Sequence, residues 1–128
     1  MRTALALLAL LSAATPAAAQ LSPAEETMVR TVEAHFEEDV TLLERITNVN
    51  SGTHNHEGVR AVGQMLVPEF EALGFDVEWI DQAHVDRAGH LFARREGDSD
   101  APRILMIGHI DTVFEPSSPF QLFARDGD

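Results

Sequence analysis

The sequence predicts an α/β domain with a mixed sheet, in which two helices precede a meander of strands. Apolar residues recur at helical spacing over roughly the first 50 residues after residue 22, and they alternate with polar residues from Phe75 onward. The links between the predicted strands are short and polar. Because parallel neighbours need a long crossover, consecutive strands that lie side by side should pair antiparallel.

The first helix is expected over residues 23–47 and the second over residues 56–73. Ser22 can cap the first helix, Pro23 suits its first position, and Glu25 can reach back to complete a capping box. Gly74 is a suitable residue to end the second helix. Pro68 lies within that helix and should bend it or break it locally, because it removes a backbone donor.

Three strands are expected, near residues 75–81, 90–95 and 103–108. In the first, Val77 and Trp79 should face one way and Asp76 and Glu78 the other. The third contains four consecutive apolar residues, so we expect it to be central in the sheet and buried on both faces. No regular element is evident after Ile107.

Residues 1–19 have the pattern of a secretory signal peptide, with Arg2, an Ala/Leu-rich stretch and a small-residue cleavage site after Ala19. A membrane anchor is the alternative, but the apolar run is shorter than the about 20 residues that span a bilayer. We therefore expect a secreted or periplasmic protein whose folded part is residues 20–128, with no association with membranes.

The composition excludes several kinds of chemistry. Without residues 1–19 the chain keeps 21 acidic and eight basic residues, a net charge of −13, which disfavours nucleic acid and anionic lipid as partners. It contains no cysteine, so disulfides and thiolate ligands are absent. All its basic residues are arginine, so lysine chemistry is absent as well.

His109 and Asp111 are the residues that best suggest chemistry, because they directly follow the predicted buried strand. Ligand sites in α/β sheets gather at the carboxyl ends of strands. Imidazole is a good zinc ligand, and its second ring nitrogen usually bonds a carboxylate or carbonyl group, which Asp111 could supply. On spacing alone, such a pair is more often a local hydrogen-bonded contact in a loop than half of a metal site, since one ligand cannot hold a zinc ion that requires three or more.

The segment Gly108–Phe114 resembles the first metal-binding motif of the co-catalytic zinc exopeptidases, a family that includes glutamate carboxypeptidase, aminoacylase and acetylornithine deacetylase. Other segments resemble the family in the same order along the chain, so the similarity extends over residues 24–128. These segments are Leu42–Thr53, Asn55–Val59, Glu71–Val77 and Phe123–Asp128.

The resemblance implies a three-layer fold with a mixed sheet, of which only the N-terminal part is present. It implies that His109 binds one of two Zn²⁺ ions and that Asp111 orients it as part of the catalytic machinery. For Ser51, Gly52 and Thr53, a structural turn is favoured over contact with substrate. The family's bridging Asp, its general base, its remaining ligands and a later domain used for substrate binding or dimerisation would all lie beyond Asp128.

The function implied by the resemblance is zinc-dependent hydrolysis of an amide bond next to a C-terminal amino acid, with glutamate preferred. The substrate would be a small peptide or an N-acyl amino acid, and a homodimer could form through the domain that is absent here. An aminoacylase or deacetylase is the alternative enzyme, and a non-catalytic periplasmic domain of the same fold is the alternative from another class. Residues 20–128 alone are expected to be inactive.

Overall fold

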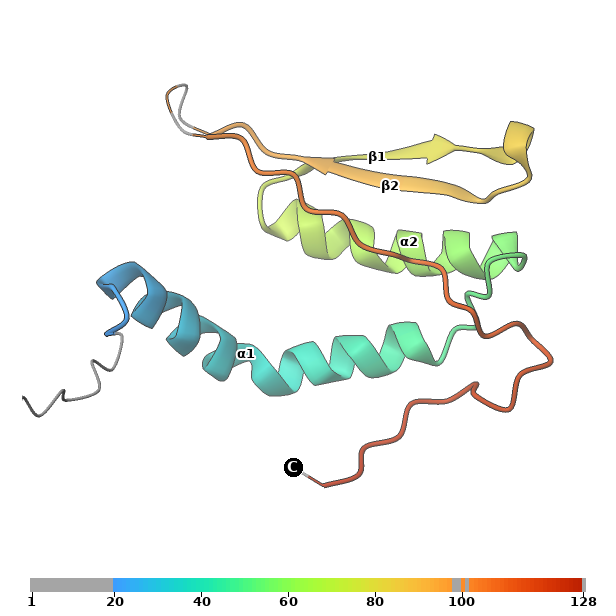
Figure 1. Cartoon of the computed structure of the whole chain (residues 1–128), viewed down its shortest axis with the longest axis horizontal. Coiled ribbons are helices and arrows are strands. Elements are labelled where there is room, and N and C mark those ends of the chain that lie inside the picture. Colours follow the sequence, from blue (N-terminus) through green and yellow to red (C-terminus); the bar gives the residue numbers. More distant parts are fainter. Residues whose placement is uncertain (1–19, 98–99, 101, 128) are drawn as a thin grey trace, which may run out of the picture. The chain divides into compact units, whose positions relative to one another are not determined.

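The computed structural model describes residues 20–97, 100 and 102–127 (Figure 1). The predicted signal peptide, residues 1–19, lies outside the described residues. The chain divides into two compact units, with the boundary between His35 and Phe36. The elements occur in the order α1, α2, β1, η1 and β2, so the protein combines helices with a small sheet, as an α/β chain should.

Helix α1 spans Pro23–Thr47, which confirms the predicted bounds. It begins in the first unit with the expected capping box. The Ser22 backbone N–H donates to Glu25 Oε2 at 2.7 Å, and the Glu25 N–H donates to Ser22 Oγ at 3.3 Å. No residue of α1 is buried, although its sequence carries an apolar stripe. Neither described helix is both long and apolar enough to cross a membrane.

Helix α2 spans His56–Ala72 and is capped by Asn55, whose side chain accepts a hydrogen bond from the Gly58 N–H at 3.2 Å. It ends in a Schellman arrangement in which Gly74 has a φ of +79°, as expected for a glycine at this position. The expected break at Pro68 is wrong, because the helix continues through it. Proline removes only one helical bond, and the carbonyl that loses it belongs to the exposed Gln64, where water can replace the donor.

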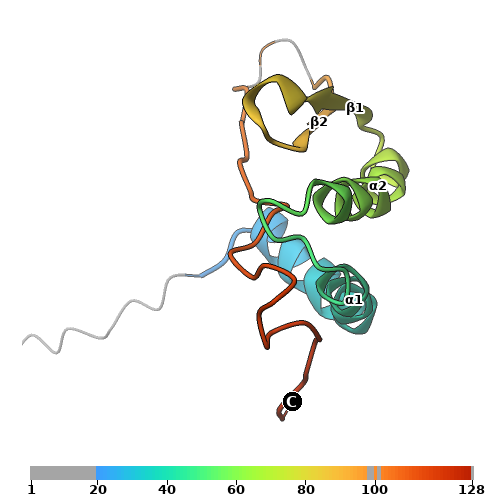
Figure 2. The ribbon, with the colours of Figure 1, turned by 90° about the vertical axis from the view of Figure 1, so that its right-hand side faces the viewer.

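The second helix is followed by an antiparallel hairpin of β1, Asp76–Asp81, and β2, Gly89–Arg94, joined through the short 3₁₀ helix η1, Ala83–Val85. Both strands and their antiparallel pairing were expected. Val77 and Trp79 are partly buried while their neighbours are exposed, which confirms the predicted alternation. Hairpin and α2 pack together (Figures 1 and 2), and the buried apolar side chains there are Val59, Val62 and Ala88.

The predicted third strand at residues 103–108 is wrong. The segment has no regular secondary structure in the described chain. Its side chains are exposed rather than central in a sheet, at 85% for Ile104, 75% for Leu105, 84% for Met106 and 85% for Ile107. A strand requires a neighbour that pairs with its N–H and C=O groups, and the described residues provide none here. The sheet in the described residues therefore has two strands that pair antiparallel, so it is not the expected mixed sheet.

Candidate metal and catalytic site

A short latch fixes the chain on either side of the candidate site. The turn before α2 and the segment after His109 meet in an isolated parallel bridge between Gly52 and Thr112. The Thr112 N–H donates to the Ser51 carbonyl at 2.8 Å, and the Thr53 N–H donates to the Thr112 carbonyl at 3.0 Å. Ser51 is only 5% exposed, so the latch is shielded from water on the side of the turn.

Gly52 makes this close approach possible. A β-carbon at Gly52 would lie 2.8 Å from the Glu115 Cα and 2.9 Å from the Phe114 carbonyl oxygen. Such distances are far below the about 3.5–4.0 Å at which carbon atoms pack. The glycine is therefore required for the two backbones to pair, which gives the Ser-Gly-Thr turn a structural role, as the sequence favoured.

Three further contacts hold the segment that follows the latch. The Asn50 amide donates to the Phe114 carbonyl at 2.8 Å and to Gln121 Oε1 at 2.9 Å. The Phe123 N–H donates to Asn48 Oδ1 at 2.8 Å. These bonds connect residues more than 60 positions apart in the sequence. They fix the chain that follows the candidate site, although it contains no helix or strand.

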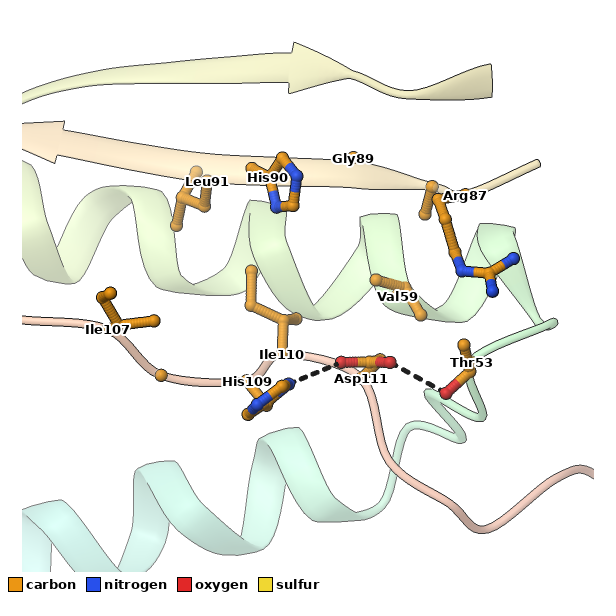
Figure 3. Close-up of a pocket in the computed structure, with 12 residues that line it drawn as sticks. Thr53, Val59, Arg87, Gly89, His90, Leu91, Ile107, His109, Ile110 and Asp111 are labelled. Atoms are coloured by element: carbon orange, nitrogen blue, oxygen red, sulfur yellow. Dashed lines mark hydrogen bonds and ion pairs between the residues drawn. The ribbon is translucent and has the colours of Figure 1, made fainter. Parts of the chain in front are cut away.

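His109 and Asp111 lie beside this latch, and the structure brings them together. His109 Nδ1 is 3.3 Å from Asp111 Oδ1, which is long for a hydrogen bond (Figure 3). In the tautomer with its proton on Nδ1, the imidazole donates to the carboxylate. The His109 side chain is 87% exposed, whereas that of Asp111 is 34% exposed. The pair thus has the geometry expected from its spacing, with the imidazole accessible to solvent.

Thr53 contacts the other oxygen of the same carboxylate. Its hydroxyl donates to Asp111 Oδ2 at 2.8 Å (Figure 3). This hydrogen bond is the main reason why the pKa of Asp111 lies below its usual value, and the contact with His109 adds a smaller effect in the same direction. Partial burial opposes both effects. Asp111 is therefore held in its ionised, hydrogen-bond-accepting form.

A cavity of about 390 Å³ lies between β2 and the segment that carries the pair (Figure 3). Thr53, His109 and Asp111 line it on one side, and Arg87 and His90 belong to the lining on the side of the hairpin. The cavity therefore has titratable groups on two sides, next to apolar side chains of α2 and β2. Its size would accommodate a small group such as an amino-acid side chain.

The donor set at the pair fits one ligand of a zinc site but not a complete one. An exposed imidazole oriented by a carboxylate suits Zn²⁺. Over residues 20–97, 100 and 102–127, however, no group of three or more His, Cys, Asp or Glu side chains is arranged to hold a metal ion. His54 is exposed in the turn before α2 and His84 lies in η1, and neither lines the cavity that contains the pair.

The sequence reasoning missed the role of Thr53 in this site. The Ser-Gly-Thr turn was assigned mainly to structure, which is correct for Gly52, but the Thr53 hydroxyl also contacts the candidate orienting acid. The only indication of Thr53 in the sequence was its place in this turn, just before the second helix. Without coordinates nothing connected it to Asp111, which is 58 residues away.

Three curated proteins are partly similar to the chain. A protein named as a LysW-lysine/LysW-ornithine hydrolase in Thermococcus kodakarensis is 38% identical over 78 residues, covering 60% of this chain and 19% of that protein. Carboxypeptidase G2 of a Pseudomonas species is 29% identical over 75 residues, 59% of this chain and 18% of the enzyme. Succinyl-diaminopimelate desuccinylase of Leptothrix cholodnii is 28% identical over 88 residues, 68% of this chain and 22% of the enzyme.

No protein-family model and no solved structure matches the chain. The chain spans about a fifth of the length of the curated relatives it matches. Their names describe a hydrolase, a carboxypeptidase and a desuccinylase, so the similarity supports a relationship to hydrolases of this peptidase and deacylase group, without favouring one member.

Proposed function

We propose that residues 20–128 form the N-terminal part of the catalytic domain of an exported, metal-dependent hydrolase that cleaves an amide bond next to a carboxylate. The observation that carries the proposal is the His109–Asp111 pair, held at 3.3 Å with the imidazole exposed. The partial similarity to three proteins named as hydrolytic enzymes supports it. Export rests on the pattern of residues 1–19, and Gln20 as the first residue of the mature protein would support it.

Within this proposal, His109 is a ligand of one of two Zn²⁺ ions, and the other ligands and the general base belong to parts of the protein outside these 128 residues. A Zn²⁺ ion held there would supply Lewis-acid chemistry, polarising the scissile carbonyl and activating water. Asp111 accepts a hydrogen bond from the Nδ1–H of His109, which fixes the tautomer and leaves the Nε2 lone pair available for the metal.

We propose glutamate as the preferred C-terminal residue, released from a peptide or from an N-acyl group. The name of the Pseudomonas relative supports a carboxypeptidase, and the choice of glutamate rests on the resemblance of the sequence segments alone. The second candidate is a deacylase that acts on small N-acyl amino acids, which the name of the Leptothrix relative, a desuccinylase, favours. Comparing the rates on an N-acyl-glutamate and on N-succinyl or N-acetyl amino acids without glutamate distinguishes the two.

The proposal is tested in the whole protein with three variants. His109→Ala should remove one zinc and nearly all hydrolysis, because it removes a ligand. Asp111→Asn should keep much of the metal and lose on the order of 10- to 100-fold in affinity or rate, the usual cost of losing the partner of a metal-bound histidine. His84→Ala is the matched control, since His84 lies in η1 and does not line the cavity that contains the pair, and it should keep both metal and activity.

The measurements are the zinc content after gel filtration and the release of glutamate with and without a chelator. Full activity in His109→Ala would refute the proposed role of that residue. Residues 20–128 alone should show no turnover, because the described residues supply one proposed ligand and no group of three that could hold a metal ion. Chelator-sensitive turnover by this piece would show that the chemistry does not depend on the rest of the protein.

A further inference from the structure

Thr53 and His109 contact opposite oxygens of a single carboxylate. Thr53 Oγ1 donates to Asp111 Oδ2 at 2.8 Å, and His109 Nδ1 lies 3.3 Å from Asp111 Oδ1 (Figure 3). The first distance is that of a good hydroxyl–carboxylate hydrogen bond, which is stronger than a bond between neutral groups. The second is long, and it involves an imidazole that is 87% exposed. The threonine contact is therefore the stronger of the two.

Without that contact, the carboxylate of Asp111 would keep only its weaker partners, the His109 imidazole and its own backbone N–H. The terminal torsion of an aspartate is broad and roughly two-fold, and this side chain is 34% exposed, so water competes for both oxygens. A long bond to an exposed imidazole cannot fix the torsion alone. A short bond on Oδ2 fixes the plane of the carboxylate and directs Oδ1 toward His109.

The position of Thr53 is itself determined by the backbone. Its N–H donates to the Thr112 carbonyl at 3.0 Å, and the reciprocal bond from the Thr112 N–H to Ser51 measures 2.8 Å. The side chain of Thr53 therefore projects from a paired segment next to the residue after Asp111. Its hydroxyl can also reach the Thr112 carbonyl, but at 3.2 Å this is the longer contact.

We propose that Thr53 is a positioning residue, whose hydroxyl orients the Asp111 carboxylate so that Oδ1 accepts a hydrogen bond from the Nδ1–H of His109 and Nε2 is left without a proton. This deepens the proposed function, because an unprotonated Nε2 is what a metal ion requires. The orientation itself needs no metal. It is a property of the three side chains in the chain described here, and it can be measured without activity.

The test is the tautomer of His109, read from the nitrogen chemical shifts of its ring by NMR at one mildly alkaline pH at which the imidazole is neutral. Wild type should be mainly protonated on Nδ1. Thr53→Val removes the hydroxyl with little change of shape, so the ring should shift toward the Nε2-protonated form that predominates in free histidine. Thr53→Ser restores a hydroxyl and should return the ring to the wild-type tautomer.

Two controls separate orientation from folding. Thr41→Val removes a hydroxyl that donates only to the Glu37 carbonyl of its own helix, and it should leave the tautomer unchanged. Asp111→Asn gives the tautomer expected when the carboxylate is lost. Thermal unfolding shows whether Thr53→Val is folded. If it is not, Thr53→Ala replaces it in the comparison with Thr53→Ser.

A hydroxyl-free variant that is folded and keeps the wild-type tautomer would overturn the proposal, as would a serine variant that does not restore it. The result is independent of the proposed hydrolase activity. A shifted tautomer in a whole protein that neither binds zinc nor hydrolyses amides would leave the positioning role in place and refute the function. Zinc-dependent hydrolysis together with an unshifted tautomer in Thr53→Val would support the function and refute the positioning role.

Discussion

Replacing Gly52 by alanine should open the latch beside the candidate site. The added β-carbon would lie 2.8 Å from the Glu115 Cα and 2.9 Å from the Phe114 carbonyl oxygen. Both atoms belong to the backbone, so relief requires the chain itself to retreat by about 1 Å to reach an ordinary carbon–carbon contact. A retreat of that size lengthens the two backbone hydrogen bonds, now 2.8 and 3.0 Å, beyond hydrogen-bonding range.

The expected magnitude follows from these two bonds. Each contributes about 0.5–1.5 kcal/mol net, so the free energy of opening the latch should fall by roughly 1–3 kcal/mol. A change of 1.4 kcal/mol is a factor of ten, so the donor amides of Thr53 and Thr112 should exchange with solvent about 5- to 150-fold faster.

The assay is amide hydrogen exchange of the protein followed by NMR. The Val59 amide, which donates to the Asn55 carbonyl at the start of α2, is an internal reference and should be unaffected by a local opening. Gly97→Ala is the matched control, because a β-carbon there meets nothing within 4 Å. Unchanged exchange at Thr53 and Thr112 in Gly52→Ala would show that the close approach does not hold the latch.

Two further predictions concern the hairpin and the exposed apolar segment. The Ala83 N–H donates to the Asp81 carboxylate and is the main cause of the lowered pKa of Asp81. The ionised Asp81 should therefore stabilise the fold above about pH 4, and this stabilisation should be lost as the pH falls through the lower pKa of the folded state. Urea unfolding between neutral and acidic pH should therefore show a smaller acid loss for Asp81→Asn than for wild type, and an equal loss would contradict the assignment. The double variant Ile104→Glu, Met106→Glu should scatter less light than wild type when the protein is concentrated, because both side chains are over 80% exposed. Its urea unfolding midpoint should be unchanged. Unchanged light scattering would mean that this segment does not drive association.

The parts of the fold that the sequence predicted correctly depend on interactions between near neighbours. The start of α1 follows from Ser22 and Glu25, three residues apart, and the end of α2 follows from Gly74. The hairpin follows from alternation in two segments joined by a short link. The His109–Asp111 contact is also local, because residues two apart in an extended chain point to the same side.

Thr53 could not be assigned from the sequence because its contact is distant along the chain. It meets Asp111 across 58 positions, through a bridge that depends on how the turn before α2 and the segment after His109 come together. The glycine that permits this approach was recognised as part of a turn, but nothing in its immediate neighbourhood indicated which segment approaches it. Contacts between residues so distant in the sequence depend on the three-dimensional path of the chain.

The error at residues 103–108 has a different origin and bears directly on the site. Four consecutive apolar residues indicate a segment that is stable when covered on both faces, but the described residues cover neither face of Ile104–Ile107. The pattern indicates a segment that needs neighbours, and periodicity cannot tell whether the chain itself supplies them.

His109 follows this segment immediately, so on that side the candidate ligand is not fixed by a strand. On the other side, Asp111 and Thr112 are fixed by Thr53 and the latch. Within the described chain the Asp111 carboxylate is therefore better fixed than the His109 imidazole. This explains why Asp111 is held at 2.8 Å by Thr53 while its contact with His109 remains at 3.3 Å.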